Sequence, residues 1–190
     1  MGTEAFADAP RRPVGALDFT VVPLDRAIEM VINLGASPVS QGVAIHFANA
    51  YNVALAEKDA GYRSLLNSGG AVFSDGMPVV WAGKRLHPAM ARSWTRVYGP
   101  DVMSGVLNGS SQFGPRHYLL GGTPETLVAL EANVRARWPQ AVIAGAESPP
   151  FGASSATDLA ERDERIRRSG ATLVWVGLGT PKQDWEVNRI

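Results

Sequence analysis

Asp75 and Gly76 directly follow residues 70–74, an apolar run of the kind that forms a buried strand. A carboxylate at the end of such a strand can act as a general base. Partial burial raises the pKa of an aspartate above its usual value of about 3.9, toward a value useful at neutral pH. An aspartate before a glycine is equally typical of a turn or a helix cap. The local pattern leaves both interpretations open.

Residues 121–124 and 177–181 share a second pattern, in which glycines are followed by threonine and then proline. Glycine lets the backbone turn sharply, and the Thr-Pro pair predicts an N-cap followed by the first helical residue. Free N–H groups at a helix start attract anions, so the two turns could hold a diphosphate, although such turns also occur without a ligand. Gln183 lies three residues after Thr180, which predicts a capping box as the alternative to a binding role.

Other kinds of site have little support in the sequence. Lys182 replaces the third glycine of a dinucleotide-binding motif, which disfavours a nicotinamide-dependent oxidoreductase, and no Walker A sequence occurs. His46, His87 and His117 do not have the spacing of metal ligands, and we expect His46 and His117 to be hydrogen-bonded core residues. No D-x-D pair is present, and the acidic cluster at 161–164 is typical of a solvated helix face. We therefore expect no metal.

Alternating strands and helices must position these residues. Strands are predicted at 18–22, 43–47, 70–74, 116–120, 141–144 and 171–176, and helices at 24–34, 50–63, 77–84, 101–107, 124–138 and 158–168, with an irregular segment at 86–100. This order predicts an α/β layered domain with a mainly parallel sheet flanked by helices. Asn49 is expected to cap the helix after the second strand. Asn49, Asp75 and both glycine turns then lie at one edge of the sheet, where such folds bind ligands.

Composition narrows the functional classes further. The 190 residues carry 18 basic and 18 acidic side chains, so the net charge is zero and no overall field draws the chain to nucleic acid. There is no cysteine, which fits a reducing cytoplasm, and there is no apolar run of 18 residues that could span a membrane. We expect residues 1–16 to form a flexible leader and residues 17–190 to form a single domain.

Five motifs stand in order along the chain: NAYNVALA at 49–56, SDGMPVVWA at 74–82, RVYGPD at 96–101, YLLGGTPE at 118–125 and VGLGTPKQDW at 176–185. Together they resemble the WecG/TagA/CpsF family of glycosyltransferases over nearly the whole chain from about residue 17. The resemblance implies a Rossmann-like fold. The set of motifs in this order is specific to the family, although each motif alone is not.

The resemblance implies transfer of a sugar with inversion from a UDP donor, without a metal. The sugar would be N-acetylmannosamine or its uronic acid, and the acceptor a polyprenyl-diphosphate-linked N-acetylglucosamine used in cell-envelope polymers. Asp75 matches the proposed base of the family, Gln183 matches a pocket residue, and Asn49 matches the asparagine after the first core strand. The residues predicted to bind substrate are Asn49, Gly76, Arg96, Asp101, Gly121, Gly122, Thr123, Gly177, Gly179, Thr180 and Gln183.

The sequence departs from the family pattern in three places. Phe47 stands where the family often has threonine, and residues 149–152 (PPFG) replace an aromatic loop, which can alter donor selection. Family members continue into a basic C-terminal segment, whereas this chain ends at Ile190. We therefore expect a truncated core. In the full-length protein, we expect the C-terminal segment to attach this core to the cytoplasmic face of the membrane. A homo-oligomer is also expected.

Two alternatives to this function remain open. The first is a non-catalytic nucleotide-binding module on the same scaffold, which Phe47 and the missing segment favour slightly. The second is the nicotinamide-dependent oxidoreductase, which the absent third glycine disfavours. Binding of UDP without transfer would identify the first, and a titration with NAD(H) would identify the second.

Overall fold

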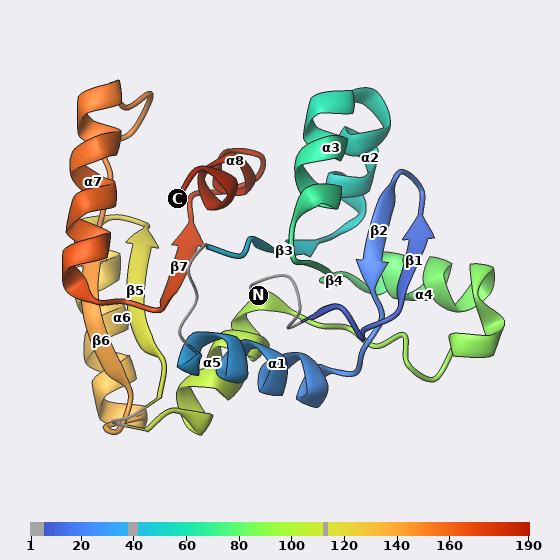
Figure 1. Ribbon diagram of the computed structural model, residues 1–190, viewed down its shortest axis with the longest axis horizontal. Helices are drawn as coiled ribbons and strands as arrows, with labels where there is room; N and C mark the ends of the chain where they lie inside the picture. The colour runs from blue at the N-terminus through green and yellow to red at the C-terminus, as the bar shows by residue number, and fades with distance from the viewer. Residues whose placement is uncertain (1–5, 38–41, 112–113) are drawn as a thin grey trace.

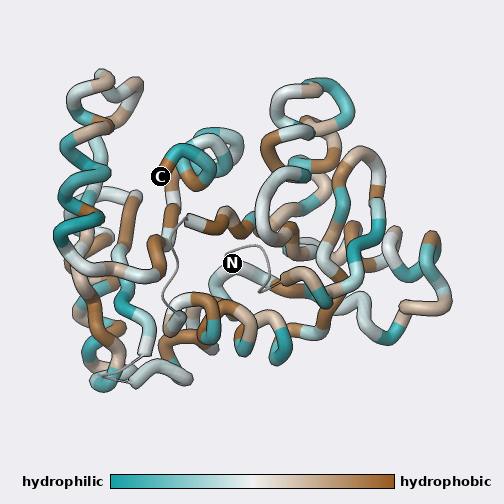
Figure 2. Tube along the Cα trace, viewed as in Figure 1, coloured by the Kyte–Doolittle hydropathy of each residue, from teal (hydrophilic) through white to brown (hydrophobic). Residues whose placement is uncertain are grey.

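The computed structural model describes residues 6–37, 42–111 and 114–190. One half of the molecule is a parallel sheet of three strands in the order β6 (Val142–Glu147), β5 (Arg116–Gly121) and β7 (Leu173–Gly177). Helices α6 (Pro124–Arg137) and α7 (Ala156–Ser169) pack against β6 at the left of Figure 1. The outer helix α7 is hydrophilic over most of its length, as expected for a solvated helix (Figure 2).

The other half contains a parallel pair, β3 (Ile45–Ala48) and β4 (Ala71–Ser74), and an antiparallel hairpin of β1 (Arg11–Val14) and β2 (Leu17–Thr20). Its helices are α1 (Leu24–Ala36), α2 (Ala50–Lys58), α3 (Ala60–Ser68), α4 (Met77–Leu86) and α5 (Gly99–Gly109), with a 3-10 turn at Pro88–Met90. The last helix, α8 (Lys182–Arg189), lies between the two halves (Figure 1).

The predicted fold class is confirmed: the structure is α/β, with parallel strands flanked by helices. Within the described residues, the strands form three hydrogen-bonded groups rather than one continuous sheet. Leu173 and Trp175 of β7 pack on the same apolar cluster as Ile45 and Phe47 of β3. Side chains rather than backbone hydrogen bonds therefore join the two parallel sheets. No helix in the described residues is both long enough and apolar enough to cross a bilayer.

The first residues are more ordered than we predicted. Residues 1–16 were expected to form a flexible leader, but β1 lies within that range and pairs with β2. Phe6 is buried and meets Phe73 of β4 with 6.1 Å between ring centroids. The physical reason is that this side chain and the hairpin cover β4 and complete the apolar core. Residues 1–5 lie outside the described part of the chain.

Three predicted helix features can be compared with the structure. Asn49 is the N-cap of α2, as predicted, and its side chain accepts a hydrogen bond from the backbone amide of Tyr51 at 2.8 Å. The long helix predicted after Asn49 is in fact two helices, because Asp59 ends α2 and caps α3 by accepting from the Tyr62 amide. Thr123 caps α6 as predicted.

Candidate active site

A cavity of about 1070 Å³ lies between the two parallel sheets. Its walls come from β3, the carboxyl end of β5, the whole of β7, the first turns of α5 and α6, and one side of α8. Asp75 lines it directly after β4, as do Gly121 and Gly122 after β5 and Gly177 at the end of β7. The carboxyl ends of strands from both halves therefore meet at one cavity, as the α/β pattern predicted.

Asp75 has an electrostatic environment suited to a base. Its Oδ1 atom is buried and has no hydrogen-bond partner among the described residues. Burial raises the pKa of its carboxyl group above the usual range, and the backbone amide of Gly99 and the charge of Arg96 partly oppose this shift. The residue as a whole is only partly buried and lines the cavity, so its carboxylate can meet a bound hydroxyl group there and accept its proton.

The raised pKa of Asp75 predicts a pH-dependent stability. A raised value means that the folded state holds the proton more tightly than the unfolded chain, so ionisation of this carboxyl group costs stability as the pH rises through the folded pKa. We expect Asp75→Asn to raise the melting temperature at pH 7. The gain should shrink on acidification and vanish below the unfolded value of about 3.9. Thermal unfolding of both proteins across this range measures the effect, and an unchanged melting temperature at pH 7 would contradict it.

Arg96 and Asp101 lie beside Asp75 but do not line the cavity. Their side chains form an ion pair at 3.8 Å, and the Arg96 guanidinium lies over the ring of Tyr98, 4.3 Å from its centroid. Both pair members are about half exposed and affect the pKa of Asp75 in opposite directions. They act on the charge of the candidate base but do not line the cavity.

The glycine turn after β5 is fitted closely to β7. Gly121 has φ of +129°, a conformation that side chains rarely adopt, and a Cβ atom built on it would lie 2.2 Å from the carbonyl oxygen of Gly177. The carbonyl of Gly122 accepts a hydrogen bond from Ser148 Oγ at 2.6 Å. The loop after β6 is thereby attached to the turn, and Lys182 Nζ attaches the same loop to α8 through the carbonyl of Gly152 at 2.9 Å.

Gly121→Ala should destabilise the fold strongly, since the new Cβ would overlap the backbone of Gly177, which cannot move without disturbing β7. We expect a loss of about 2–4 kcal/mol in the free energy of unfolding, measured in urea. Gly177→Ala is the matched control, because a Cβ there meets nothing within 4 Å and the backbone has no positive φ. Equal stability losses for both variants would contradict the packing argument.

The turn before α8 differs from the prediction. Thr180 was expected to be the N-cap and Pro181 the first helical residue, but α8 begins at Lys182 with Pro181 as its N-cap. The T-x-x-Q capping box is also absent, because the Gln183 side chain accepts a hydrogen bond from the Gly179 amide at 3.1 Å instead. Gln183 thus closes the glycine turn, and it also lines the cavity.

A buried hydrogen-bond network holds the inner side of α8. Asp184 accepts from Tyr62 Oη at 2.7 Å and pairs with His46 Nδ1 at 3.1 Å. Asn188 contacts the other ring nitrogen of His46 at 2.9 Å, and Asn52 donates to Tyr62 Oη at 2.7 Å. Asn188 Nδ2 can only donate to the ring, so Nδ1 of His46 carries the proton that is shared with Asp184. The network links α8 to β3, α2 and α3.

An ionic network holds the outer side of α8. Arg162 of α7 is buried and pairs with Glu186 at 2.9 Å and with Glu147 at 3.2 Å. Arg189 pairs with Glu186 and with Asp163, both at 2.7 Å. The helix that carries Gln183 is therefore held from both halves of the molecule.

His46 and His117 are hydrogen-bonded core residues, as predicted. His117 contacts Ser110 Oγ at 3.0 Å and accepts from Trp175 Nε1 at 3.1 Å, and burial lowers its pKa to about 4. Among the residues that the structure describes, no three His, Asp or Glu side chains group as metal ligands do.

Five of the predicted site residues line the cavity together: Asp75, Gly121, Gly122, Gly177 and Gln183. The other seven lie outside its lining: Asn49, Gly76, Arg96, Asp101, Thr123, Gly179 and Thr180. Asn49 stays close to the candidate base, because its Cβ atom lies 3.3 Å from where a Cβ of Gly76 would be.

Sequence reasoning missed Asp184 and Tyr62. The i, i+4 spacing of Asp184 and Asn188 places two polar side chains on one helix face and could have indicated a buried polar contact. No local pattern connects Tyr62 with Asp184, which lies 122 residues away in sequence.

A parallel α/β protein with a carboxylate and glycine turns around one cavity belongs to the class that binds ligands at the carboxyl ends of its strands. The model of the glycosyl transferase WecG/TagA/CpsF family matches residues 12–190. The chain belongs to this family, which is associated with the synthesis of cell-envelope polymers.

Proposed function

We propose that the protein is an inverting glycosyltransferase that uses a UDP-sugar. The sugar is of the N-acetylmannosamine type, and the acceptor is a polyprenyl-diphosphate-linked N-acetylglucosamine. The observation that carries the proposal is the position of Asp75 in the wall of the cavity, with one buried oxygen that lacks a partner. Family membership supports the reaction class.

In the proposed step, Asp75 accepts the proton of the acceptor hydroxyl group. The hydroxyl oxygen forms a bond to the anomeric carbon of the donor sugar, while the bond from that carbon to the diphosphate oxygen breaks on the opposite face. UDP leaves with the electron pair of the broken bond, and the configuration at the anomeric carbon inverts. A positioned base of this kind contributes about a hundredfold to ten-thousandfold to the rate.

The diphosphate is proposed to lie against the glycine turns after β5 and β7. The start of α6 directs backbone N–H groups and a positive helix dipole toward that end of the sheet, with Thr123 as its N-cap. Gly121 and Gly177 leave the cavity wall there without side chains. Gln183 and Asn49 are proposed to orient the substrates, with no metal taking part.

The test is a transfer assay on the protein with UDP-N-acetylmannosamine and a short-chain lipid diphosphate that carries N-acetylglucosamine. Product of inverted configuration is expected, together with stoichiometric release of UDP. A second assay with UDP-N-acetylglucosamine as the donor is the comparison for donor specificity. Absence of transfer from either donor, with UDP still bound, would refute the enzyme assignment.

That outcome would instead identify a non-catalytic nucleotide-binding module. Phe47 favours this second candidate, because its side chain lies in the cavity wall where the family often has a threonine. An aromatic side chain at this place removes a hydrogen-bonding group from the site. Calorimetric titration with UDP, run beside the transfer assay, separates the two candidates.

A further inference from the structure

Helix α4 and the turn that follows it form the end of the molecule opposite α7 (Figure 1). The inner side of α4 is fixed in the core, because Val79 and Val80 are buried and a Cβ on Gly83 would lie 2.3 Å from the ring of Trp94. Such close packing prevents the helix from rolling. The side chains on its other side therefore stay exposed.

That other side is apolar at its centre. Trp81 is 62% exposed and Met77 is 39% exposed, while Leu86, which is 58% exposed, lies at the end of the helix and on another side of it. Met77 and Trp81 are four residues apart and so lie on one helix face. Neither Met77 nor Trp81 lines the large cavity, so the face is not a part of the candidate active site. Exposed apolar side chains gathered on one face mark an interaction surface.

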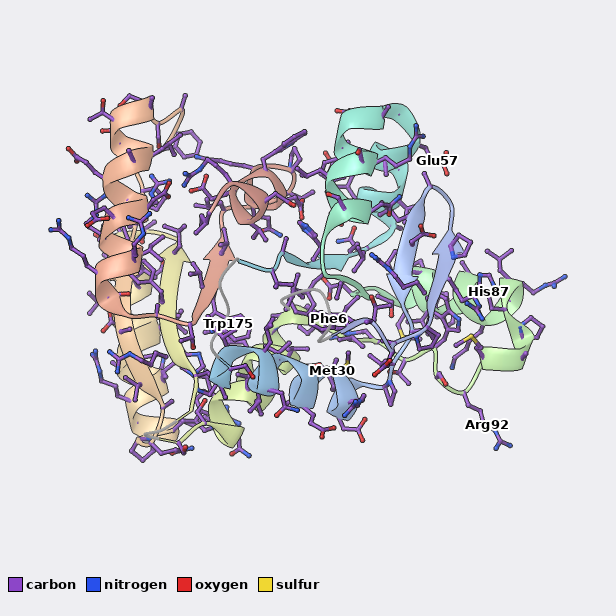
Figure 3. All side chains as sticks on the ribbon, in the orientation of Figure 1. Phe6, Met30, Glu57, His87, Arg92 and Trp175 are labelled. Carbon is purple, nitrogen blue, oxygen red and sulfur yellow. The ribbon has the colours of Figure 1, made fainter. Side chains whose placement is uncertain are left out.

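The same face is basic, and the chain between Asp75 and Asp101 contains no acidic residue. Residues 76–100 include Lys84, Arg85, Arg92 and Arg96 but no aspartate or glutamate, in a protein whose net charge is zero. Arg92 extends away from the body beyond the end of α4 (Figure 3). In the described part of the chain, no ion pair engages Lys84, Arg85 or Arg92, whereas the arginines of α7 pair with glutamates.

We propose that the α4 face, made of Met77, Trp81, Lys84 and Arg85, docks on an anionic lipid bilayer. Tryptophan flanked by lysine and arginine suits the membrane interface, where the ring enters the headgroup region and the cations contact anionic headgroups. A second copy fits the face poorly, because a two-fold contact would place like charges against one another.

The observations that support docking do not depend on the proposed function, but the role that docking would play does. The helix begins two residues after Asp75, so a bilayer at its exposed face lies close to the candidate base. A lipid-linked acceptor would then present its sugar from the same surface.

Co-sedimentation of the whole chain with vesicles tests the proposal without any sugar donor. Vesicles of phosphatidylcholine with about a third phosphatidylglycerol should bind the protein at low salt, and pure phosphatidylcholine vesicles should bind it far less. Lys84→Gln combined with Arg85→Gln should lower the partition coefficient about thirtyfold, on the order of fivefold for each charge removed. Trp81→Ala should lower it by a similar order.

Two control variants keep the result specific to this face. Lys58→Gln combined with Arg63→Gln removes the same charge from exposed sites on α2 and α3, and Val128→Ala shortens an exposed side chain on α6. Both controls should bind vesicles as the unchanged protein does, and circular dichroism should show the same thermal unfolding for all variants. Equal loss of binding in the controls, or no binding to anionic vesicles, would overturn the proposal.

Sedimentation velocity distinguishes a protein partner from the bilayer. If the α4 face holds a second copy, the unchanged protein will sediment as a dimer without vesicles, and Trp81→Ala will sediment as a monomer. That result without vesicle binding would overturn the proposal in favour of self-association. The sugar-transfer assay is separate, so failure of the proposed function leaves the vesicle result intact.

Discussion

Asp75→Asn should lower the rate of sugar transfer by about a hundredfold to ten-thousandfold, while the affinity for UDP stays close to that of the unchanged protein. The amide has the shape of the carboxyl group and can still accept a hydrogen bond, so the cavity wall keeps its form. It cannot accept the proton of an attacking hydroxyl group. Initial rates with saturating donor measure the loss, and calorimetric titration with UDP measures the affinity.

The matched control is Asp18→Asn, which makes the same change of charge at an exposed position on β2. Its rate should equal that of the unchanged protein. Retained transfer by Asp75→Asn would show that another group acts as the base. A parallel loss of UDP affinity would instead assign Asp75 to binding.

Asp184→Ala should lower the free energy of unfolding by about 3 kcal/mol. Asp184 is buried and accepts hydrogen bonds from His46 and Tyr62, which are buried as well. Without the carboxylate, both donors would lose their acceptor while remaining buried. Urea unfolding followed by circular dichroism gives the change in stability.

Glu161→Ala is the control for the loss of an acidic side chain, since Glu161 is largely exposed on α7. We expect it to change the stability by no more than about 0.5 kcal/mol. Asp184→Asn should fall between the two, because one amide oxygen can serve only part of the network. If Asp184→Ala were as stable as Glu161→Ala, the network would not hold α8.

The sequence predicted the parts of the fold that local physics determines. Alternation of apolar runs with helical patterns predicted the α/β class, and Asn49 and Thr123 were recognised as caps because capping depends on the cap residue and its nearest neighbours. The position of Asp75 at the cavity was predicted for a similar reason, since a carboxylate directly after a buried strand lies at the edge where such folds bind ligands, and its role as a base stays a prediction.

The parts that could not be predicted depend on contacts between distant residues. Phe6 is a single large apolar residue in a segment without a strand or helix pattern, and only its packing on Phe73 shows that the N-terminal segment belongs to the core. Thr180 has the sequence of a cap, but Gln183 bonds to the Gly179 amide instead. The pairing of Tyr62 with Asp184 joins segments that no periodicity relates.

The attachment of α8 to both halves has a consequence for the order of folding. An eight-residue helix is too short to persist alone in water, so α8 forms only where other segments hold it. Its contact with β3 closes a separation of 138 residues, and such distant contacts form only after the chain has lost much of its entropy. The wall that carries Gln183 should therefore assemble last, when both halves are already folded. A half-folded chain would contain Asp75 and the strands around it, but no finished cavity in which a sugar could react.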